Sequence, residues 1–235
     1  MLNLFFNYLL LFFIYSILGW IVETTFLAIT EKKWVDRGFL IGPYCPIYGV
    51  GSILIVLYLT QYKNNFITVF ILGVVVSSIL EYFTSYIMEK LFKTRWWDYS
   101  NKKFNLNGRI CGLNSLLFGL CSIGVIYFIQ PILSLFIKIL NTNLLVIITI
   151  IFLMIFITDI IISCNVANKF KKTVLNLELK KDSTQEFTKL VRETIKNNHK
   201  ILQKRLFMAF PNIDLKRLRS LKSEIKEEIK EFLNK

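Results

Sequence analysis

The chain has 235 residues, of which 54% are hydrophobic and only 19% are charged, whereas about a quarter of the residues in a typical soluble domain are charged. A mean hydropathy of +0.51 and 15% aromatic residues exclude disorder for the first two thirds of the chain and exceed the apolar content that a soluble domain of this size can bury. The net charge of +13 is concentrated outside the apolar stretches, so it indicates membrane topology rather than nucleic-acid binding.

Long charge-free runs predict helices that cross a membrane. A helix needs about 20 apolar residues to cross roughly 30 Å of hydrocarbon, and five stretches meet or nearly meet that length. Backbone groups in lipid must be hydrogen-bonded internally, and the alternating pattern of a barrel is absent, so these stretches are expected to be helical. The sequence therefore predicts an all-α polytopic bundle over residues 1–168, with about five transmembrane helices near residues 4–28, 46–62, 66–89, 111–136 and 143–165.

Basic residues are distributed unevenly between the two sides that five helices define. One side receives the N-terminus and two loops with two basic residues, Lys63 and Lys138, whereas the two loops on the other side contain nine. Loops rich in Lys and Arg stay in the cytoplasm, which makes the second side cytoplasmic. The first helix is expected to be retained, because no basic segment precedes it and no small-residue cleavage site follows it. The chain is thus predicted to be a multi-pass protein of a bacterial cell membrane, with an outside N-terminus and a cytoplasmic C-terminus.

The segment that joins the first two predicted helices has an unusual composition. Four glycines, together with Pro43 and Pro46, interrupt an otherwise apolar stretch over residues 34–51. Proline breaks helices and glycine permits turns and close backbone approach. The segment is expected to dip into the membrane before the second helix begins, which requires shielding by protein or a water-filled cavity. The glycines do not form a phosphate-binding loop, because no GxxxxGK[ST] motif is present.

Glu23, Glu81 and Asp159 are acidic residues that lie in or at the ends of predicted spans. Ionisable side chains inside a membrane are costly and usually face the protein interior. Glu81 is the deepest of the three. Small residues recur every four positions on its helix face: Gly73, Ser77 and Ser85. Because small residues let membrane helices approach closely, this face is expected to point inward.

Arginines in the two cytoplasmic loops are the expected partners of these acids. Arg37 and Arg109 are the candidates to pair with Glu81, because both loops return to the same end of the helices. A network of arginines and carboxylates then either locks the loops onto the bundle or binds a small polar ligand or lipid headgroup. In an alternative for Glu23 and Asp159, these acids simply reach the headgroup region.

The second loop, residues 95–109, is rich in aromatic and polar residues. Trp96, Trp97 and Tyr99 are expected at the headgroup level. The candidate residues for a ligand or structural polar network are Glu23, Arg37, Cys45, Tyr48, Glu81, Trp97, Asp98, Tyr99, Asn105, Arg109, Asn114 and Asp159. No cysteine or histidine spacing suits zinc, and the only histidine lies in the tail, so no metal site, cofactor or catalytic residue is predicted.

The tail, residues 169–235, has a different composition, with 18 Lys and Arg against 9 Asp and Glu. Apolar residues recur at helical spacing over residues 187–206 and again over residues 221–233, on either side of Pro211. This pattern predicts a cytoplasmic helical hairpin that lies on anionic lipid or docks a partner. In the alternative, the tail packs on itself or on a second copy. Because the five helices have apolar faces of their own, removal of residues 175–235 is expected to leave the bundle folded.

Five sequence motifs occur in the order Gly19-Trp20-x-x-Glu23, Arg37-Gly-Phe-Leu-x-Gly-Pro-x-Cys-Pro-Ile-Tyr-Gly49, Glu81, Trp97-Asp-Tyr-Ser100 and Asn105-x-x-Gly-Arg109. In these motifs the chain, over roughly residues 10 to 165, resembles the putative ABC-transporter type IV family, also called CmpB-like. A shorter family element is similar to residues 205–212. The resemblance implies a membrane permease. No Walker A motif is present, so any ATPase would be a separate chain.

Three functions remain open from the sequence. The first is a permease-type component with a cytoplasm-facing polar pocket or network. The second is a membrane scaffold whose tail recruits partners. The third is a membrane-embedded enzyme that acts on lipid headgroups, with Glu81 or Asp98 as acid or base and Cys45 as nucleophile, although Cys45 has no histidine partner. The expected partners are the lipid bilayer, a separate ATPase or another cytoplasmic protein bound through the tail, and a second copy of the chain; nucleic acid is not expected.

Overall fold

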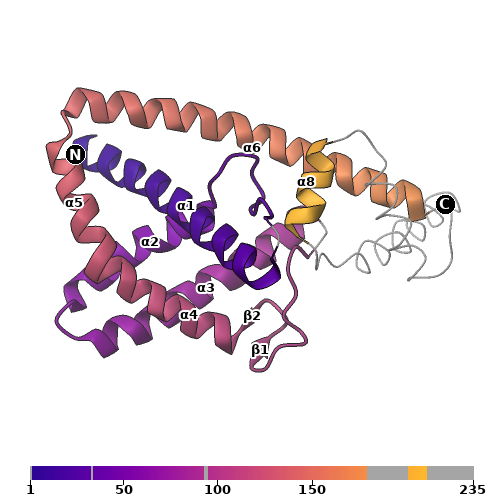
Figure 1. Ribbon diagram of the computed structural model, residues 1–235, viewed down its shortest axis with the longest axis horizontal. Helices are drawn as coiled ribbons and strands as arrows, with labels where there is room; N and C mark the ends of the chain where they lie inside the picture. Colours follow the sequence, from indigo (N-terminus) through magenta and orange to yellow (C-terminus); the bar gives the residue numbers. More distant parts are fainter. Residues whose placement is uncertain (1, 33, 93–94, 179–200, 211–235) are drawn as a thin grey trace, which may run out of the picture.

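The computed structural model describes residues 2–32, 34–92, 95–178 and 201–210 of the chain (Figure 1). Most of these residues are helical, and the two strands found among them, β1 (Asn105–Leu106) and β2 (Ile110–Cys111), form an antiparallel pair. The α-helices are α1 (Leu2–Glu31), α2 (Pro46–Leu59), α3 (Phe66–Phe92), α4 (Gly112–Gly124), α5 (Gln130–Ile139), α6 (Thr142–Glu178) and α8 (Ile201–Ala209). The prediction of an all-α helical bundle is confirmed.

Four helical spans within the described residues are long and apolar enough to cross a membrane. They are Asn3–Thr30, Phe66–Phe92, Gly112–Ile139 and Thr142–Lys169. The remaining predicted span, residues 46–62, forms α2 and the short 3₁₀ helix η1 (Thr60–Tyr62), which together make a shorter apolar helix. α6 continues beyond residue 168, where the sequence places the end of the bundle, and reaches Glu178.

The segment between α1 and α2 folds back along α1. The backbone N–H of Cys45 donates a hydrogen bond of 2.9 Å to the carbonyl of Ser16, near the middle of α1. α2 therefore begins about halfway along α1. Gly49 lies so close to α1 that a Cβ atom would come within 2.6 Å of the Phe12 carbonyl oxygen. The segment thus packs against α1; its expected dip into the membrane stays a prediction.

Small residues set the close packing of α3 against α4. A Cβ atom added to Gly73 would lie 2.4 Å from the Ser122 hydroxyl, and one added to Gly119 would lie 2.5 Å from a Val74 methyl carbon. Nearer to the C-terminal end of α3, the Ser78 hydroxyl donates a 2.8 Å hydrogen bond to the hydroxyl of Ser115 in α4. Gly73, which belongs to the small-residue face of α3, thus points toward α4, as the sequence predicts for this face. Helices approach closely where side chains are small.

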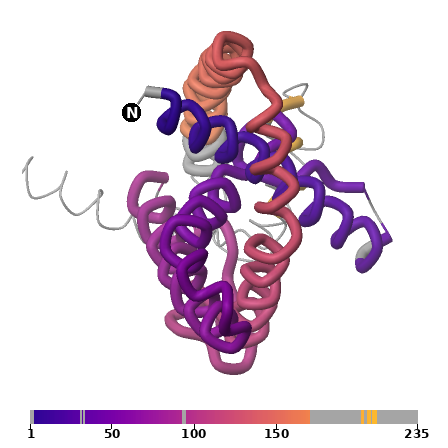
Figure 2. Tube along the Cα trace, turned by 90° about the vertical axis from the view of Figure 1, so that its left-hand side faces the viewer, coloured from indigo at the N-terminus to yellow at the C-terminus, as the bar shows by residue number. Residues whose placement is uncertain are grey.

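α4 and α5 form one continuous rod with an irregular turn between them. Residues Val125–Ile129 are a π-helical segment, η2, and Gln130 and Pro131 follow directly. Proline lacks an N–H and cannot complete the preceding turn, and π segments interrupt α-helices at such sites. Gln130 then accepts a 2.7 Å hydrogen bond from the Tyr15 hydroxyl of α1. Figure 2 shows α5 running from the α3–α4 pair to α6 along the side of the bundle.

One end of the bundle gathers the elements that contain the charged side chains. The C-terminal ends of α1 and α3, the β1–β2 pair and α8 lie there, opposite the N-terminus and the corner between α5 and α6 (Figure 1). We call this the polar end and define it as residues 20–32, 34–45, 81–92, 95–111, 159–169 and 201–210. The rest of the tail, residues 179–200 and 211–235, lies outside the described residues, and so do most positions of the predicted hairpin.

Candidate functional site

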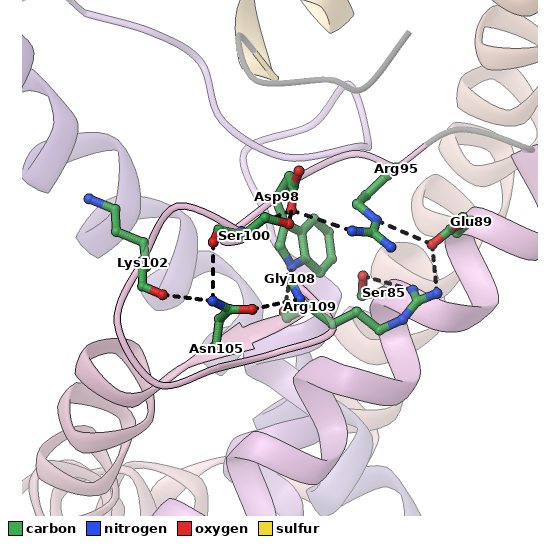
Figure 3. A network of polar contacts seen from close by, with 10 residues as sticks. Ser85, Glu89, Arg95, Asp98, Ser100, Lys102, Asn105, Gly108 and Arg109 are labelled. Carbon is green, nitrogen blue, oxygen red and sulfur yellow. Dashed lines mark hydrogen bonds and ion pairs between the residues drawn. The ribbon is translucent and has the colours of Figure 1, made fainter. Parts of the chain in front are cut away.

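Glu89 is the centre of an ion-pair network at the end of α3 (Figure 3). Its Oε2 lies 2.7 Å from Nη2 of Arg109 and 3.4 Å from Nε of Arg95. Arg109 also donates a 3.3 Å hydrogen bond to the Ser85 hydroxyl one turn earlier on α3, and Arg95 reaches Asp98 at 3.4 Å. Glu89 and Arg109 are both buried. The network fastens the loop after α3 back onto the helix from which it emerges.

The loop itself is ordered by local hydrogen bonds, also drawn in Figure 3. Asn105 donates to the carbonyls of Ser100 and Lys102, at 3.2 and 2.8 Å, and accepts the N–H of Gly108 at 3.2 Å. Gly108 has a φ of +66°, and a Cβ atom there would lie 2.3 Å from the Asp98 carboxylate. Glycine is therefore required at this position by both conformation and space.

Asp98 stays ionised within this loop. Partial burial opposes the charged form, but hydrogen bonds from Ser100 and the charge of Arg95 outweigh it and lower the pKa of Asp98. Its Oδ1 accepts the Ser100 hydroxyl at 2.6 Å and the Ser100 N–H at 3.0 Å. A carboxylate with this many donors shapes the loop, and it is poorly suited to give or take a proton in a reaction.

Trp97 and two tyrosines of α3 enclose Arg109. The Trp97 indole N–H donates to the Arg109 carbonyl at 3.2 Å. The guanidinium carbon of Arg109 lies 5.6 Å and 5.4 Å from the ring centres of Tyr82 and Tyr86, which is within the range of cation–π contacts. Arg109 is thus fully engaged by the protein.

Glu23 and the first loop form a second ion-pair group, which also includes α8. Nε of Arg37 lies 3.3 Å from Oε1 of Glu23, and Arg37 donates a further hydrogen bond to the carbonyl of Ala209 in α8. Next to it, Asp36 lies 2.6 Å from Arg205 of α8 and accepts the Trp20 indole N–H at 2.9 Å. The tail segment is therefore connected by charge to both α1 and the returning loop.

Apolar packing supports this connection. Leu206 and Ala209 of α8 are buried in a cluster with Phe92, Trp96 and Ala167. The ring of Trp96 also meets that of Phe210 at 5.0 Å. Trp96, which the sequence expects at the headgroup level, is 3% exposed because it packs in this cluster. Because α8 contributes Leu206 to this cluster, removal of residues 175–235 would uncover the cluster; whether the bundle folds without its tail stays a prediction.

Asp159 of α6 anchors the returning loop. Its carboxylate accepts the backbone N–H groups of Ile41 and Gly42, at 2.9 and 2.7 Å, and the hydroxyl of Tyr44 at 2.5 Å. The Ser163 hydroxyl donates a fourth hydrogen bond at 2.8 Å. Two otherwise unpaired backbone donors of the irregular segment are thus satisfied, which the interior of a membrane protein requires.

The surroundings of Glu81 differ from those of the other buried acids, Glu89 and Asp159. Its side chain is buried, at 5% exposure, and its Oε1 accepts the Tyr99 hydroxyl at 3.2 Å. Within the described residues, Oε2 is buried without a hydrogen-bond partner. The expected pairing of Glu81 with Arg37 or Arg109 is wrong, because Arg37 pairs with Glu23 and Arg109 pairs with Glu89.

Groups from three elements surround Glu81. Glu23 of α1 adds its negative charge to this site. Tyr48 of α2 packs against α1 so closely that a Cβ atom on Gly19 would lie 2.3 Å from it, and it is influenced by the charges of both glutamates. Burial, followed by the charge of Glu81 and their hydrogen bond, raises the pKa of Tyr99, so Tyr99 remains a neutral donor.

Cys45 lies near the same group, with its Sγ 4.0 Å from Oε2 of Glu23. Burial and the Glu23 charge raise the pKa of the Cys45 thiol. A thiol needs to be deprotonated to act as a nucleophile, so these surroundings disfavour the enzymatic alternative. Asn114 is half-buried on α4, and within the described residues its side chain makes no hydrogen bond or ion pair.

The sequence interpretation missed Glu89, Asp36 and the role of Arg205. Glu89 could have been found, because it continues the four-residue series that runs through Glu81 and Ser85. Asp36 and Arg205 are separated by 169 positions in the chain, and no local pattern connects them. Among the described residues, no group of three or more His, Cys, Asp or Glu side chains could hold a metal ion.

A family model described as putative ABC-transporter type IV matches residues 10–164. The matched range begins within α1 at Leu10 and includes the rest of α1, α2 to α5, both loops of the polar end and most of the spanning part of α6. No curated protein and no solved structure matches the chain significantly.

Proposed function

The chain belongs to the putative ABC-transporter type IV family, and from this premise we propose that it is the permease component of a membrane transport system. It presents a polar site to the cytoplasm and works with an ATPase that is a separate chain. Family membership and the four long apolar spans support a multi-pass membrane protein. The role as a permease, the solute site and the orientation are parts of the proposal.

The observation that carries the proposal is the returning loop, residues 34–45. It runs alongside the middle of α1, and its backbone is held there by Asp159 of α6 and by the Ser16 carbonyl. Irregular backbone at membrane depth is tolerated where it is buried in protein or lines a water-filled path, and broken helices at such depth build the binding sites of transporters. A scaffold that only recruits partners has no need of such a segment.

The orientation follows from the distribution of charge. The two loops that the sequence predicts on this side contain nine basic residues, against two on the other side, and loops rich in Lys and Arg stay in the cytoplasm. This distribution supports the proposal that α8 and the loop 95–111 face the cytoplasm, where a separate ATPase could contact them. The N-terminus is then outside.

Cells that lack the gene provide the test. Their content of small solutes and ions is compared with that of cells complemented by wild type, by Asp159→Asn or by the matched control Thr158→Ala, whose side chain is exposed on the neighbouring position. Asp159→Asn keeps the shape but weakens the anchor of the returning loop. We expect one solute class to change on deletion, and to be restored by wild type and Thr158→Ala but only weakly by Asp159→Asn.

The scaffold alternative predicts a different result. If solute contents are unchanged on deletion while a membrane protein complex falls apart, the chain recruits partners and the permease proposal is wrong. Western blots of membrane fractions confirm that each variant is inserted at the wild-type level, so that loss of function is not mistaken for loss of protein.

A further inference from the structure

Glu81 has a chemical requirement that the protein itself does not meet. Its side chain is 5% exposed, and within the described part of the chain Oε2 has no hydrogen-bond partner. A buried carboxylate without a positive partner is costly, so it is stable only when it holds a proton or binds a cation. The arginines that could have served as partners are committed to Glu23 and Glu89.

The position of Glu81 within the bundle strengthens its need for a proton or a cation. It lies 11 positions before the end of α3 at Phe92, which corresponds to roughly 16 Å from the polar end along a helix that rises about 1.5 Å per residue. The Ser78–Ser115 hydrogen bond lies one turn further into the bundle. Tyr99 of the loop 95–111 covers the carboxylate from the polar end.

The neighbouring groups select the kind of cation. One carboxylate oxygen without a partner matches a single positive charge that can donate a hydrogen bond. The Tyr99 side chain contacts the carboxylate through its hydroxyl, and Tyr48 of α2 is close enough to interact with the Glu81 charge; aromatic side chains such as these attract ammonium groups. The titratable groups that act on this site are Glu23 from α1, Cys45 from the returning loop, Tyr48 from α2, and Tyr99 and Cys111 from the second loop. None of these is a cation.

We propose that Glu81, with Tyr99 and Tyr48, forms a binding site for an ammonium group, which replaces a proton on the carboxyl when it binds. In the unliganded site, Glu81 holds the proton. On binding, the O–H bond of the carboxyl breaks, the proton leaves to water, and an N–H of the ammonium group donates a hydrogen bond to Oε2. Charge is conserved, since one positive charge enters as one proton leaves.

The exchange makes binding depend on pH. Because the proton and the ammonium group compete for one carboxylate, binding is weaker at low pH and becomes stronger as pH rises through the range in which Glu81 loses its proton. The hydrogen bond from Tyr99 stabilises the charged carboxylate, so it favours the ammonium-bound form. The meaning of the site for transport rests on the proposed function, whereas the binding itself does not.

Methylammonium added to the full-length protein in detergent tests binding directly. In weakly buffered solution with a pH indicator, we expect about one proton to be released per chain, because a single carboxyl is discharged. Glu81→Gln should abolish the release, and Tyr99→Phe should weaken methylammonium binding about tenfold, as expected for the loss of one hydrogen bond to a charged group. Asp36→Asn, which removes a carboxylate that already has protein partners, is the matched control and should behave as wild type.

Carboxyl labelling provides a second readout on the unaltered protein. Dicyclohexylcarbodiimide reacts with protonated carboxyls in apolar surroundings, so Glu81 should be modified, and methylammonium should protect it. Tetramethylammonium, which has no N–H donor, should protect poorly. Absence of labelling at Glu81 in the wild-type protein, or equal protection by sodium chloride, would overturn the proposal even if Glu81→Gln fails to fold.

Nanodiscs distinguish the two sources of an ammonium group. Protection of Glu81 by phosphatidylethanolamine but not by phosphatidylcholine, without protection by free methylammonium, assigns the group to a lipid headgroup. Protection by methylammonium in both lipids assigns it to a soluble solute. The permease proposal fails separately: if ammonium protects Glu81 while deletion of the gene leaves solute contents unchanged, the site stands without the transport function.

Discussion

Glu81 and Glu89 lie on the same face of α3, two turns apart, and both are buried. Glu89 contacts two arginines, at 2.7 and 3.4 Å, and these arginines belong to the loop that follows the helix. Glu81 receives one hydroxyl group, from Tyr99, and within the described residues its Oε2 has no hydrogen-bond partner. The same residue type on the same face thus occupies two different environments.

The comparison separates two roles for buried acids in one bundle. Glu23, Glu89 and Asp159 each hold a loop or a helix in place, and their interactions are made within the chain. A fully partnered acid resists change, because removing it leaves buried donors unpaired. Glu81 contributes little to holding loops, and its unused oxygen makes it the acid of the polar end best suited to a ligand.

The largest effect is expected from Glu89→Gln. This change leaves Arg95 and Arg109 without their shared carboxylate in a buried position, and loss of one partner from a buried ion pair costs about 3–5 kcal/mol of the free energy of unfolding. Thermal melting of the detergent-solubilised protein measures it. The matched variant is Glu81→Gln, and equal melting temperatures for the two variants would break the distinction between these acids.

Leu206→Ala tests whether the packing of α8 stabilises the protein, as the ion pairs of the partnered acids do. Leu206 is 2% exposed in the cluster that contains Trp96, and α8 also provides the carbonyl that receives Arg37. Truncating a buried leucine costs about 2–5 kcal/mol, and we expect the lower part of this range because α8 is at the edge of the bundle. Met208→Ala on the same helix, where the side chain is 51% exposed, is the control and should melt like wild type. A normal melting curve for Leu206→Ala would mean that α8 is dispensable.

Gly73→Ala examines the inward side of the face that contains both glutamates. A Cβ atom there would lie 2.4 Å from the Ser122 hydroxyl, and forcing an extra carbon into a packed core costs about 1–3 kcal/mol. Gly124→Ala is the control, because nothing lies within 4 Å of its Cβ position. It should be neutral or slightly stabilising, since alanine favours helix over glycine. If both variants melt alike, the α3–α4 contact is looser than described.

The smallest change in stability is expected from Glu81→Gln. Glutamine keeps the shape and the hydrogen bond with Tyr99 but needs no proton, so we expect the free energy of unfolding to change by less than about 1 kcal/mol. Melting curves recorded at low and neutral pH provide the measurement. A large loss of stability would show that Glu81 is a structural residue after all, and the ligand site would have to be abandoned.

Sequence alone was sufficient for the helices but not for the pairing of the charged side chains. The long spans are runs of apolar residues, and their length is set by the thickness of a membrane, which is a one-dimensional property. The burial of Glu81 also follows from its four-residue series with Gly73 and Ser85. The choice between Arg37 and Arg109 as its partner could not be made, because it depends on the paths of two irregular loops.

The docking of α8 shows the same limit. Residues 201–210 lie in a basic, amphipathic stretch that reads as a surface helix, and the residues that bury Leu206 come from α3, α6 and the loop after α3. The start of the shorter span at residues 46–62 was predictable, because Pro46 stands in the first turn of α2. The return of the chain to the middle of α1 before that start was not, since it depends on the hydrogen bond from Cys45 to the Ser16 carbonyl.

Infrared difference spectroscopy tests the central claim most directly, because it detects the proton on Glu81. The spectrum of wild type at neutral pH, minus that of Glu81→Gln, should contain the carbonyl stretch of one protonated carboxyl, and the same band should disappear from wild type when methylammonium is added. A difference spectrum with only the bands of an ionised carboxylate, unchanged by methylammonium, would show that Glu81 has a permanent positive partner and would contradict the account.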